Sequence, residues 1–109
     1  MRSLVIGATG GIGQAVAAAL SARGEVVRLS RADGLDVTDE ASVSDVLGRI
    51  TGTFDLIFVA TGVLGSPEKA LRALSADEAL TQFRVNALGP ALVLKHTVRL
   101  LPRDKRAVF

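Results

Sequence analysis

The sequence has no cysteine and no tyrosine, and its aromatic residues amount to only 4%. Without cysteine there is neither a disulfide framework nor a thiolate metal site, which favours a reducing, cytoplasmic location. No apolar run reaches the roughly 18 residues of a membrane span, and the first residues lack the pattern of a cleaved leader. The 13 basic and 11 acidic residues are spread along the chain, so we expect no membrane and no nucleic-acid partner.

The length of 109 residues permits one domain, residues 1–109, which is small for an open α/β sheet. Hydrophobic residues make up 49% of the chain and charged residues 22%, as is typical of globular proteins. The last three residues, Ala107-Val108-Phe109, have the pattern of a strand that is beginning. We therefore expect a single domain that is incomplete at its C-terminus.

Strand-like and helix-like patterns alternate along the chain. Short apolar runs predict buried parallel strands at 2–6, 26–30 and 54–60. Helical spacing predicts helices at 12–23, from 39 to 50, from 66 and over 76–101. Residues 35–37 could form a very short strand, although a parallel crossover needs about a dozen residues. The alternation predicts an α/β fold with a Rossmann-like parallel sheet and helices on both faces, truncated after the fourth or at the start of the fifth strand.

Capping residues mark the starts of two of these helices. Thr38 or Asp39 can cap the helix whose apolar face carries Val43, Val46, Leu47 and Ile50. Ser75 and Glu78 have the spacing of a capping box at the start of the longest helical stretch.

The glycine cluster Gly7-Ala8-Thr9-Gly10-Gly11-Ile12-Gly13 lies between the first predicted strand and the first predicted helix. Its glycines permit unusual turn dihedrals and leave no β-carbons to keep a pyrophosphate off the backbone. The first N–H groups of the following helix have no partner within the helix and carry its positive dipole end. Because ligands bind at the carboxyl ends of parallel strands, the loop 61–65 is expected to face this turn. The arrangement predicts a dinucleotide site.

Four motifs together resemble the short-chain dehydrogenases/reductases. They are the glycine turn at Gly7 to Gly13, Asp36-Val37, Val59-Ala60-Thr61-Gly62 and Asn86-Ala87-Leu88-Gly89, in that family's order and approximate spacing. The resemblance covers nearly the whole chain. It departs in detail, because the family usually has threonine where this chain has Ile6 and Asn-Asn-Ala-Gly where it has Val59 to Gly62.

The resemblance implies roles for these residues in holding a nicotinamide dinucleotide. Gly7, Gly11 and Gly13 would take the phosphate-turn positions, with Thr9 and Gly10 in the same turn and Ile12 beneath the nicotinamide. Asp36 would meet the adenine through its carboxylate and Val37 through its backbone, while Ala60, Thr61 and Gly62 would line the opposite wall. Asp36 could instead be an ordinary turn or helix-cap residue.

The end of the second strand favours NADP(H) over NAD(H). An acidic side chain there would bind the ribose hydroxyls, whereas a basic one suits the 2′-phosphate. This chain has Ser30-Arg31, in which Arg31 offers a forked, charge-assisted contact and Ser30 a hydroxyl. Arg31 could also be a solvated turn residue.

Asn86 and Pro90 form a second candidate feature. Pro90 has no N–H to donate to the carbonyl of Asn86, so a kink is expected there. In the resembling family the equivalent asparagine carbonyl holds a water of the proton relay, which makes Asn86 the one candidate catalytic residue. A kink without catalysis is the alternative. His96 lacks companions at ligand spacing, so we predict a surface or packing residue and no metal site.

These observations predict the cofactor-binding part of an oxidoreductase that reversibly reduces a carbonyl substrate to an alcohol. The family's catalytic serine, tyrosine and lysine have no counterparts in the 109 residues, so little turnover is expected from this chain alone. The alternative is a non-catalytic nucleotide-sensing or scaffold module. Gly7, Gly10 and Gly13 also fit the G-x-x-G-x-x-G spacing of other branches of the family. The helical stretch 76–101 is apolar on nearly every face, which predicts a homo-oligomer.

Overall fold

The computed structural model describes residues 1–62, 73–104 and 107–108. Its sheet has the strands β1 (Arg2–Ile6), β2 (Glu25–Leu29), β3 (Leu56–Val59) and β4 (Ala107–Val108), in the order β2-β1-β3-β4. All three pairings are parallel, with Leu4 opposite Val27 and Ile57, and Ile57 opposite Ala107. The parallel sheet is confirmed, and β4 confirms the strand expected at 107.

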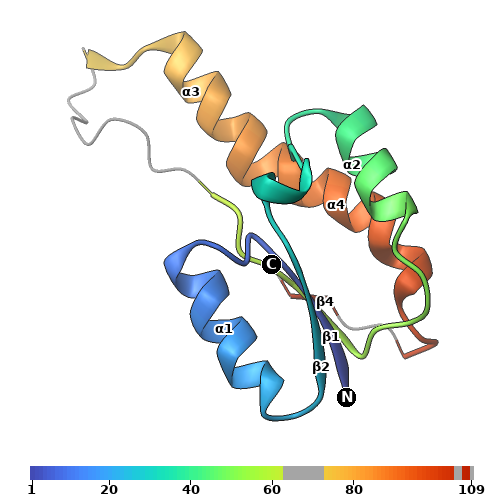
Figure 1. Cartoon of the computed structure of the whole chain (residues 1–109). Coiled ribbons are helices and arrows are strands. Elements are labelled where there is room, and N and C mark those ends of the chain that lie inside the picture. The colour runs from blue at the N-terminus through green and yellow to red at the C-terminus, as the bar shows by residue number, and fades with distance from the viewer. Residues whose placement is uncertain (63–72, 105–106, 109) are drawn as a thin grey trace.

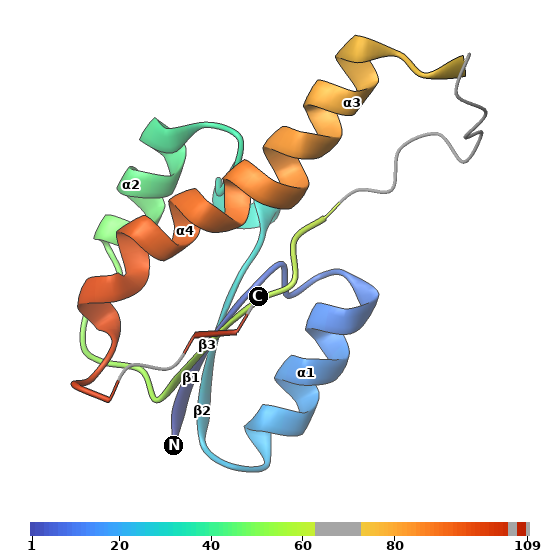
Figure 2. The ribbon, with the colours of Figure 1, turned by 180° about the vertical axis from the view of Figure 1, so that it is seen from behind.

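The helices cover both faces of the sheet, as Figures 1 and 2 show. The helix α1 (Gly11–Ser21) lies on one face, and α2 (Glu40–Gly48) with α4 (Gly89–Thr97) lies on the other. Successive strand residues point to opposite faces of the sheet. Leu4, Ile6 and Ile57 pack into the larger core under α2 and α4. Val5 lies in a smaller cluster with Ala17 of α1. The Rossmann-like arrangement predicted from the alternation is therefore confirmed.

Residues 35–37 do not form a strand. The turn η1 (Arg31–Asp33) is followed by Gly34 in the left-handed conformation, with φ of 84°. The backbone N–H of Asp36 then donates to Ser42 Oγ at 2.9 Å instead of to a neighbouring strand. Leu35 and Val37 nevertheless pack into the core. The apolar residues at 35 and 37 are therefore buried without forming a strand. The link from the end of β2 to residue 35 is too short for the crossover that a parallel strand needs.

The strand predicted at 54–60 is shorter in the structure, where β3 begins at Leu56. Phe54 is buried, but its N–H donates to the carbonyl of Leu100 at 2.8 Å, outside the sheet. The short helix predicted from residue 66 lies outside the described residues.

The stretch predicted as one helix over 76–101 is divided into four pieces. These are α3 (Ala76–Phe83), a π-helical turn η3 (Arg84–Leu88), α4, and a 3-10 turn η4 (Val98–Leu100). They follow one another along a single continuous path in Figure 2. The wide turn ends two residues before Pro90, which agrees with the irregularity expected from the missing N–H. In the described part of the chain, no helix is long and apolar enough to cross a membrane.

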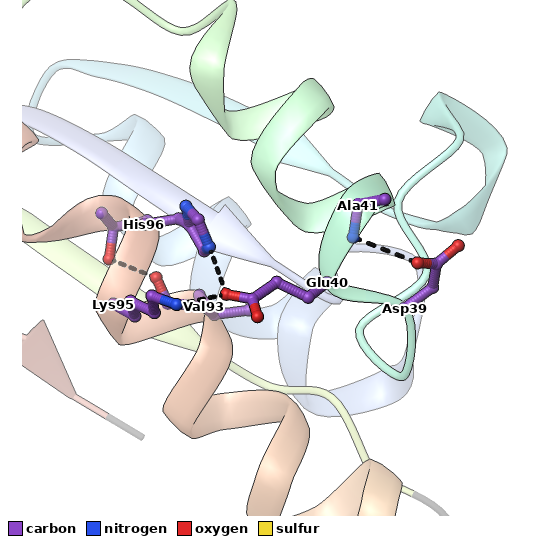
Figure 3. Close-up of polar contacts among 7 residues, drawn as sticks. Asp39, Glu40, Ala41, Val93, Lys95 and His96 are labelled. Atoms are coloured by element: carbon purple, nitrogen blue, oxygen red, sulfur yellow. Dashed lines mark hydrogen bonds and ion pairs between the residues drawn. The ribbon is translucent and has the colours of Figure 1, made fainter.

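Figure 3 shows how a polar cluster joins the start of α2 to the end of α4. Glu40 Oε2 accepts from Lys95 Nζ at 2.6 Å and lies 2.8 Å from His96 Nε2. Asp39 caps α2 by accepting from the N–H of Ala41. These contacts give His96 a packing role between the two helices, as the sequence indicated.

The same cluster predicts a pH dependence of stability. The hydrogen bonds from Lys95 and then His96 lower the pKa of Glu40 from its ordinary value of 4.5. Because the folded-state pKa is the lower one, this stabilisation is complete above about pH 4.5 and is lost as the pH falls through the lowered pKa. Denaturant unfolding should therefore separate the chain from Glu40→Gln near neutral pH, with the difference shrinking in acid. If the difference in unfolding free energy between the chain and Glu40→Gln did not change with pH, the ionised Glu40 carboxylate would not be the stabilising group.

Candidate functional site

The glycine turn between β1 and α1 is held by close backbone packing. Gly7 has a φ of +84°, and a Cβ there would lie 2.8 Å from the carbonyl carbon of Ala60. A Cβ on Gly13 would lie 2.0 Å from the carbonyl oxygen of Gly7. The N–H groups of Gly7 and Ala8 both donate to the carbonyl of Leu29 at the end of β2. These contacts require glycine at positions 7 and 13 and fix the turn at the ends of three strands.

The other two glycines of the turn face open space. The nearest atom to a Cβ on Gly10 would be 3.7 Å away, and none lies within 4 Å of one on Gly11. The helix α1 begins at Gly11, and its first turn, all of it described, carries no acidic side chain. Its N–H groups and dipole therefore meet an accessible surface, which suits a phosphate group.

The end of β2 is closed by a small hydrogen-bonded turn. Asp33 accepts from the backbone N–H of Ser30 at 2.8 Å, and Ser30 Oγ accepts from the N–H of Ala32 at 3.3 Å. Ser30 is 8% exposed, and its hydroxyl also lies 3.4 Å from the Asp33 carboxylate. The hydroxyl that the sequence assigned to a 2′-phosphate is thus engaged within the turn. Arg31 is exposed, and its side chain makes no hydrogen bond or ion pair within the described residues.

The end of β3 forms the facing wall. Its chain passes close to Gly7, and the N–H of Ala60 donates to the carbonyl of Ile6. Thr61 Oγ1 is buried and has no hydrogen-bond partner among the residues that the structure describes. An unsatisfied buried hydroxyl costs about 1–3 kcal/mol. A ligand group reaching this wall would supply the missing partner.

These walls enclose a cleft of about 450 Å³ at the carboxyl ends of β1, β2 and β3. Such a position is where open parallel sheets bind their ligands. The cleft is lined by most of the predicted cofactor residues, namely Gly7, Thr9, Gly10, Ser30, Arg31, Asp36, Val37, Ala60, Thr61 and Gly62. Gly11, Ile12 and Gly13 are not part of the lining: Gly13 is buried under the turn, whereas Ile12 is 71% exposed beside it. That these residues bind a cofactor stays a prediction.

The Asp36 carboxylate is held at the cleft wall by Thr38. Its Oδ1 accepts from the backbone N–H of Thr38 at 2.9 Å and from the Thr38 hydroxyl at 2.6 Å. These two hydrogen bonds lower the pKa of Asp36, and the positive charge of Arg31 contributes to the shift. The aspartate is therefore kept ionised as a hydrogen-bond acceptor.

Asn86 lies beside the cleft and does not line it. A Cβ on Gly62 would lie 3.3 Å from Asn86 Oδ1, so the asparagine side chain packs against the end of the β3 wall. It belongs to the π-helical turn η3, in which the N–H of Gly89 donates to the carbonyl of Arg84. Turns of this kind occur often at functional sites. A part for Asn86 in proton transfer stays a prediction.

Sequence reasoning missed several lining residues, namely Ile6, Leu35, Thr38, Thr81 and Val85. Thr81 and Val85 belong to the segment that α3 begins, more than 40 positions from Asp36, and no local pattern indicates that this helix forms a wall. Thr38 did carry a signal, because threonine two residues after aspartate suits a local side-chain hydrogen bond. Within the described ranges, no three His, Asp or Glu residues are grouped to hold a metal ion.

Several solved structures resemble this chain. A small-chain dehydrogenase in complex with NADPH is 31% identical, with 99% of this chain and 49% of that protein covered and a TM-score of 0.86. A short-chain dehydrogenase/reductase from Burkholderia multivorans with bound NADP is 23% identical, with 99% and 57% covered and a TM-score of 0.85. A ribose-5-phosphate isomerase from Brucella melitensis is 25% identical, with 90% and 45% covered and a TM-score of 0.74.

The chain thus spans about half the length of the solved structures that it matches. No family model matches it, and no curated protein matches it in sequence. The isomerase among the similar structures shows that the fold alone does not identify the reaction.

Proposed function

Since this chain has the fold of about half of a short-chain dehydrogenase/reductase, we propose that it is the NADP(H)-binding part of such an enzyme. The observation that carries the proposal is the cleft at the strand ends, which is lined by both Gly10, the residue before α1, and Arg31. Backbone N–H groups suit the pyrophosphate bridge of the dinucleotide, and the Arg31 guanidinium, which has no partner among the described residues, suits its 2′-phosphate.

Different residues along the cleft would bind different parts of the dinucleotide. The glycine turn would hold the pyrophosphate, Arg31 the 2′-phosphate, and Asp36 with Val37 the adenine. The wall at Thr61 would face the nicotinamide half of the dinucleotide. NADP(H) supplies hydride chemistry when bound, and the parent reaction that we propose is reversible reduction of a carbonyl substrate to an alcohol. Asn86, beside the β3 wall, would belong to the proton relay of the complete enzyme.

A non-catalytic NADP(H)-sensing or scaffold module is the second candidate. The chain contains the cleft but no tyrosine, and the family resemblance assigns proton transfer to a tyrosine. Carbonyl-dependent oxidation of NADPH by this chain at an ordinary enzymatic rate would exclude the sensing module. Binding of NADPH without turnover agrees with either candidate.

Thermal unfolding with and without NADPH tests the cofactor proposal. A ligand that binds only the folded state stabilises it by about 2.7 kcal/mol at 100 times its Kd. For a domain of this size, that shifts the Tm by about 10 °C or more. We expect NADPH to raise the Tm in a concentration-dependent manner. An unchanged Tm at millimolar NADPH would contradict the proposal.

We also propose that the chain forms a homo-oligomer through the segment 76–101. Large apolar side chains are exposed along its described helices, at Leu80, Phe83, Leu88, Leu94 and Val98. Phe83 is 60% exposed, so burying it against a second copy would remove much apolar surface from water. Sedimentation should show a dimer or larger species that Phe83→Glu shifts towards monomer. A monomer at high concentration would contradict the proposal.

A further inference from the structure

Residues 35–38 all line the cleft, and two of them, Leu35 and Val37, also belong to the hydrophobic core. Leu35 and Val37 are buried, with exposures of 3% and 8%, and both belong to the core under α2 and α4. Asp36 lies between them and lines the cleft together with Thr38. Two buried anchors therefore hold the aspartate at a fixed place on the cleft wall.

The backbone of this segment is also held from two sides. Ser42 Oγ accepts from the N–H of Asp36 at 2.9 Å and donates to the carbonyl of Gly34 at 2.7 Å. On the other side, Val37 packs against α4, where a Cβ on Gly89 would lie 2.8 Å from Val37 Cγ2. A backbone fixed in this way leaves the χ angles of Asp36 as the main freedom of its carboxylate.

Thr38 removes that remaining freedom. Both of its donors, the N–H and the hydroxyl, bind the same carboxylate oxygen, Oδ1. Within the described residues, no donor binds Oδ2. One oxygen is thus used to orient the group, and the other remains as an acceptor for a ligand in the cleft.

We propose that Thr38 is a positioning residue that makes the cleft selective for a 6-aminopurine over a 6-oxopurine. This inference rests on the proposed dinucleotide function. The amino group of adenine donates to a carboxylate oxygen, whereas the 6-oxo group of hypoxanthine is an acceptor and opposes it. An acceptor held in place discriminates strongly, because the wrong base leaves a polar group without a partner. A carboxylate free to rotate away from the base discriminates less.

The test compares the Kd of NADPH with that of its hypoxanthine analogue for the intact chain and for Thr38→Val. A hydrogen bond to a charged group corresponds to about a tenfold preference or more. We expect the chain to prefer NADPH by about tenfold or more, and Thr38→Val to reduce the preference to about twofold. Thr38→Ser keeps the hydroxyl and should restore the preference. Thr53→Val, at an exposed residue away from the cleft, should leave it unchanged.

The ratio of the two Kd values distinguishes positioning from a purely structural role. If Thr38 only stabilises the turn, Thr38→Val will weaken both ligands equally and keep the ratio, which would overturn the inference. An unaltered chain that binds both ligands equally would also overturn it. Asp36→Asn, whose amide can donate to a 6-oxo group, should bring the ratio to about one or below, and a preserved ratio would again contradict the inference. Failure of both ligands to bind the unaltered chain would instead overturn the proposed function.

Discussion

Replacing Gly13 by alanine is expected to destabilise the chain by about 3 kcal/mol or more. The new Cβ would lie 2.0 Å from the carbonyl oxygen of Gly7 and 2.8 Å from its carbonyl carbon. Neither atom can move easily, because the N–H of Gly7 is bonded to the end of β2 and its α-carbon packs against the chain at Ala60. Denaturant unfolding measures the loss directly.

Gly10→Ala is the matched control for this change. Gly10 has an extended backbone with φ of −74°, and the nearest atom to its Cβ would be 3.7 Å away. Its stability should fall by less than about 1 kcal/mol. Because Gly10 lines the cleft, this variant should nevertheless weaken NADPH binding. If Gly13→Ala were as stable as Gly10→Ala, the packing described for the turn would be wrong.

Replacing Arg31 by alanine is expected to remove most of the preference for NADPH over NADH. The Ser30 hydroxyl is engaged within its turn, so Arg31 is the remaining group at the end of β2 for a 2′-phosphate. A charge-assisted contact contributes about 1.5–3 kcal/mol, so NADPH should bind roughly 10- to 100-fold more weakly while NADH changes little. Paired titrations of the two cofactors measure this.

Arg31→Lys separates charge from geometry at the same position. Lysine keeps the charge but not the planar fork, so its NADPH affinity should lie between those of the unaltered chain and the alanine variant. An equal loss for NADPH and NADH in Arg31→Ala would show that the arginine contacts a part common to both cofactors.

The features predicted well from the sequence are those determined by local chemistry. Asp39 caps α2 and Ser75 accepts from the N–H of Glu78, because short polar side chains satisfy the free N–H groups of a helix start. The glycine turn was likewise predictable, because the positive φ of Gly7 and the close backbone packing at Gly7 and Gly13 leave no room for a Cβ.

The features that the sequence did not show depend on residues far apart in the chain. β3 starts late because the N–H of Phe54 bonds to Leu100, which lies 46 positions further on. Thr81 and Val85 complete the cleft only because the helical segment from α3 to α4 returns across the sheet. The sequence assigned the Ser30 hydroxyl to a ligand. Its hydrogen bonds within the turn, to Ala32 and Asp33, could not be predicted because they depend on how the turn closes.

The cleft is proposed to bind a nicotinamide dinucleotide that carries a 2′-phosphate. The most direct test of this binding is calorimetric titration of the purified chain with NADPH and, in parallel, with NADH. We expect saturable binding of NADPH at one site per chain with a Kd in the micromolar range, about −8 kcal/mol, and weaker binding of NADH. Absence of saturable binding by either cofactor would contradict the proposal.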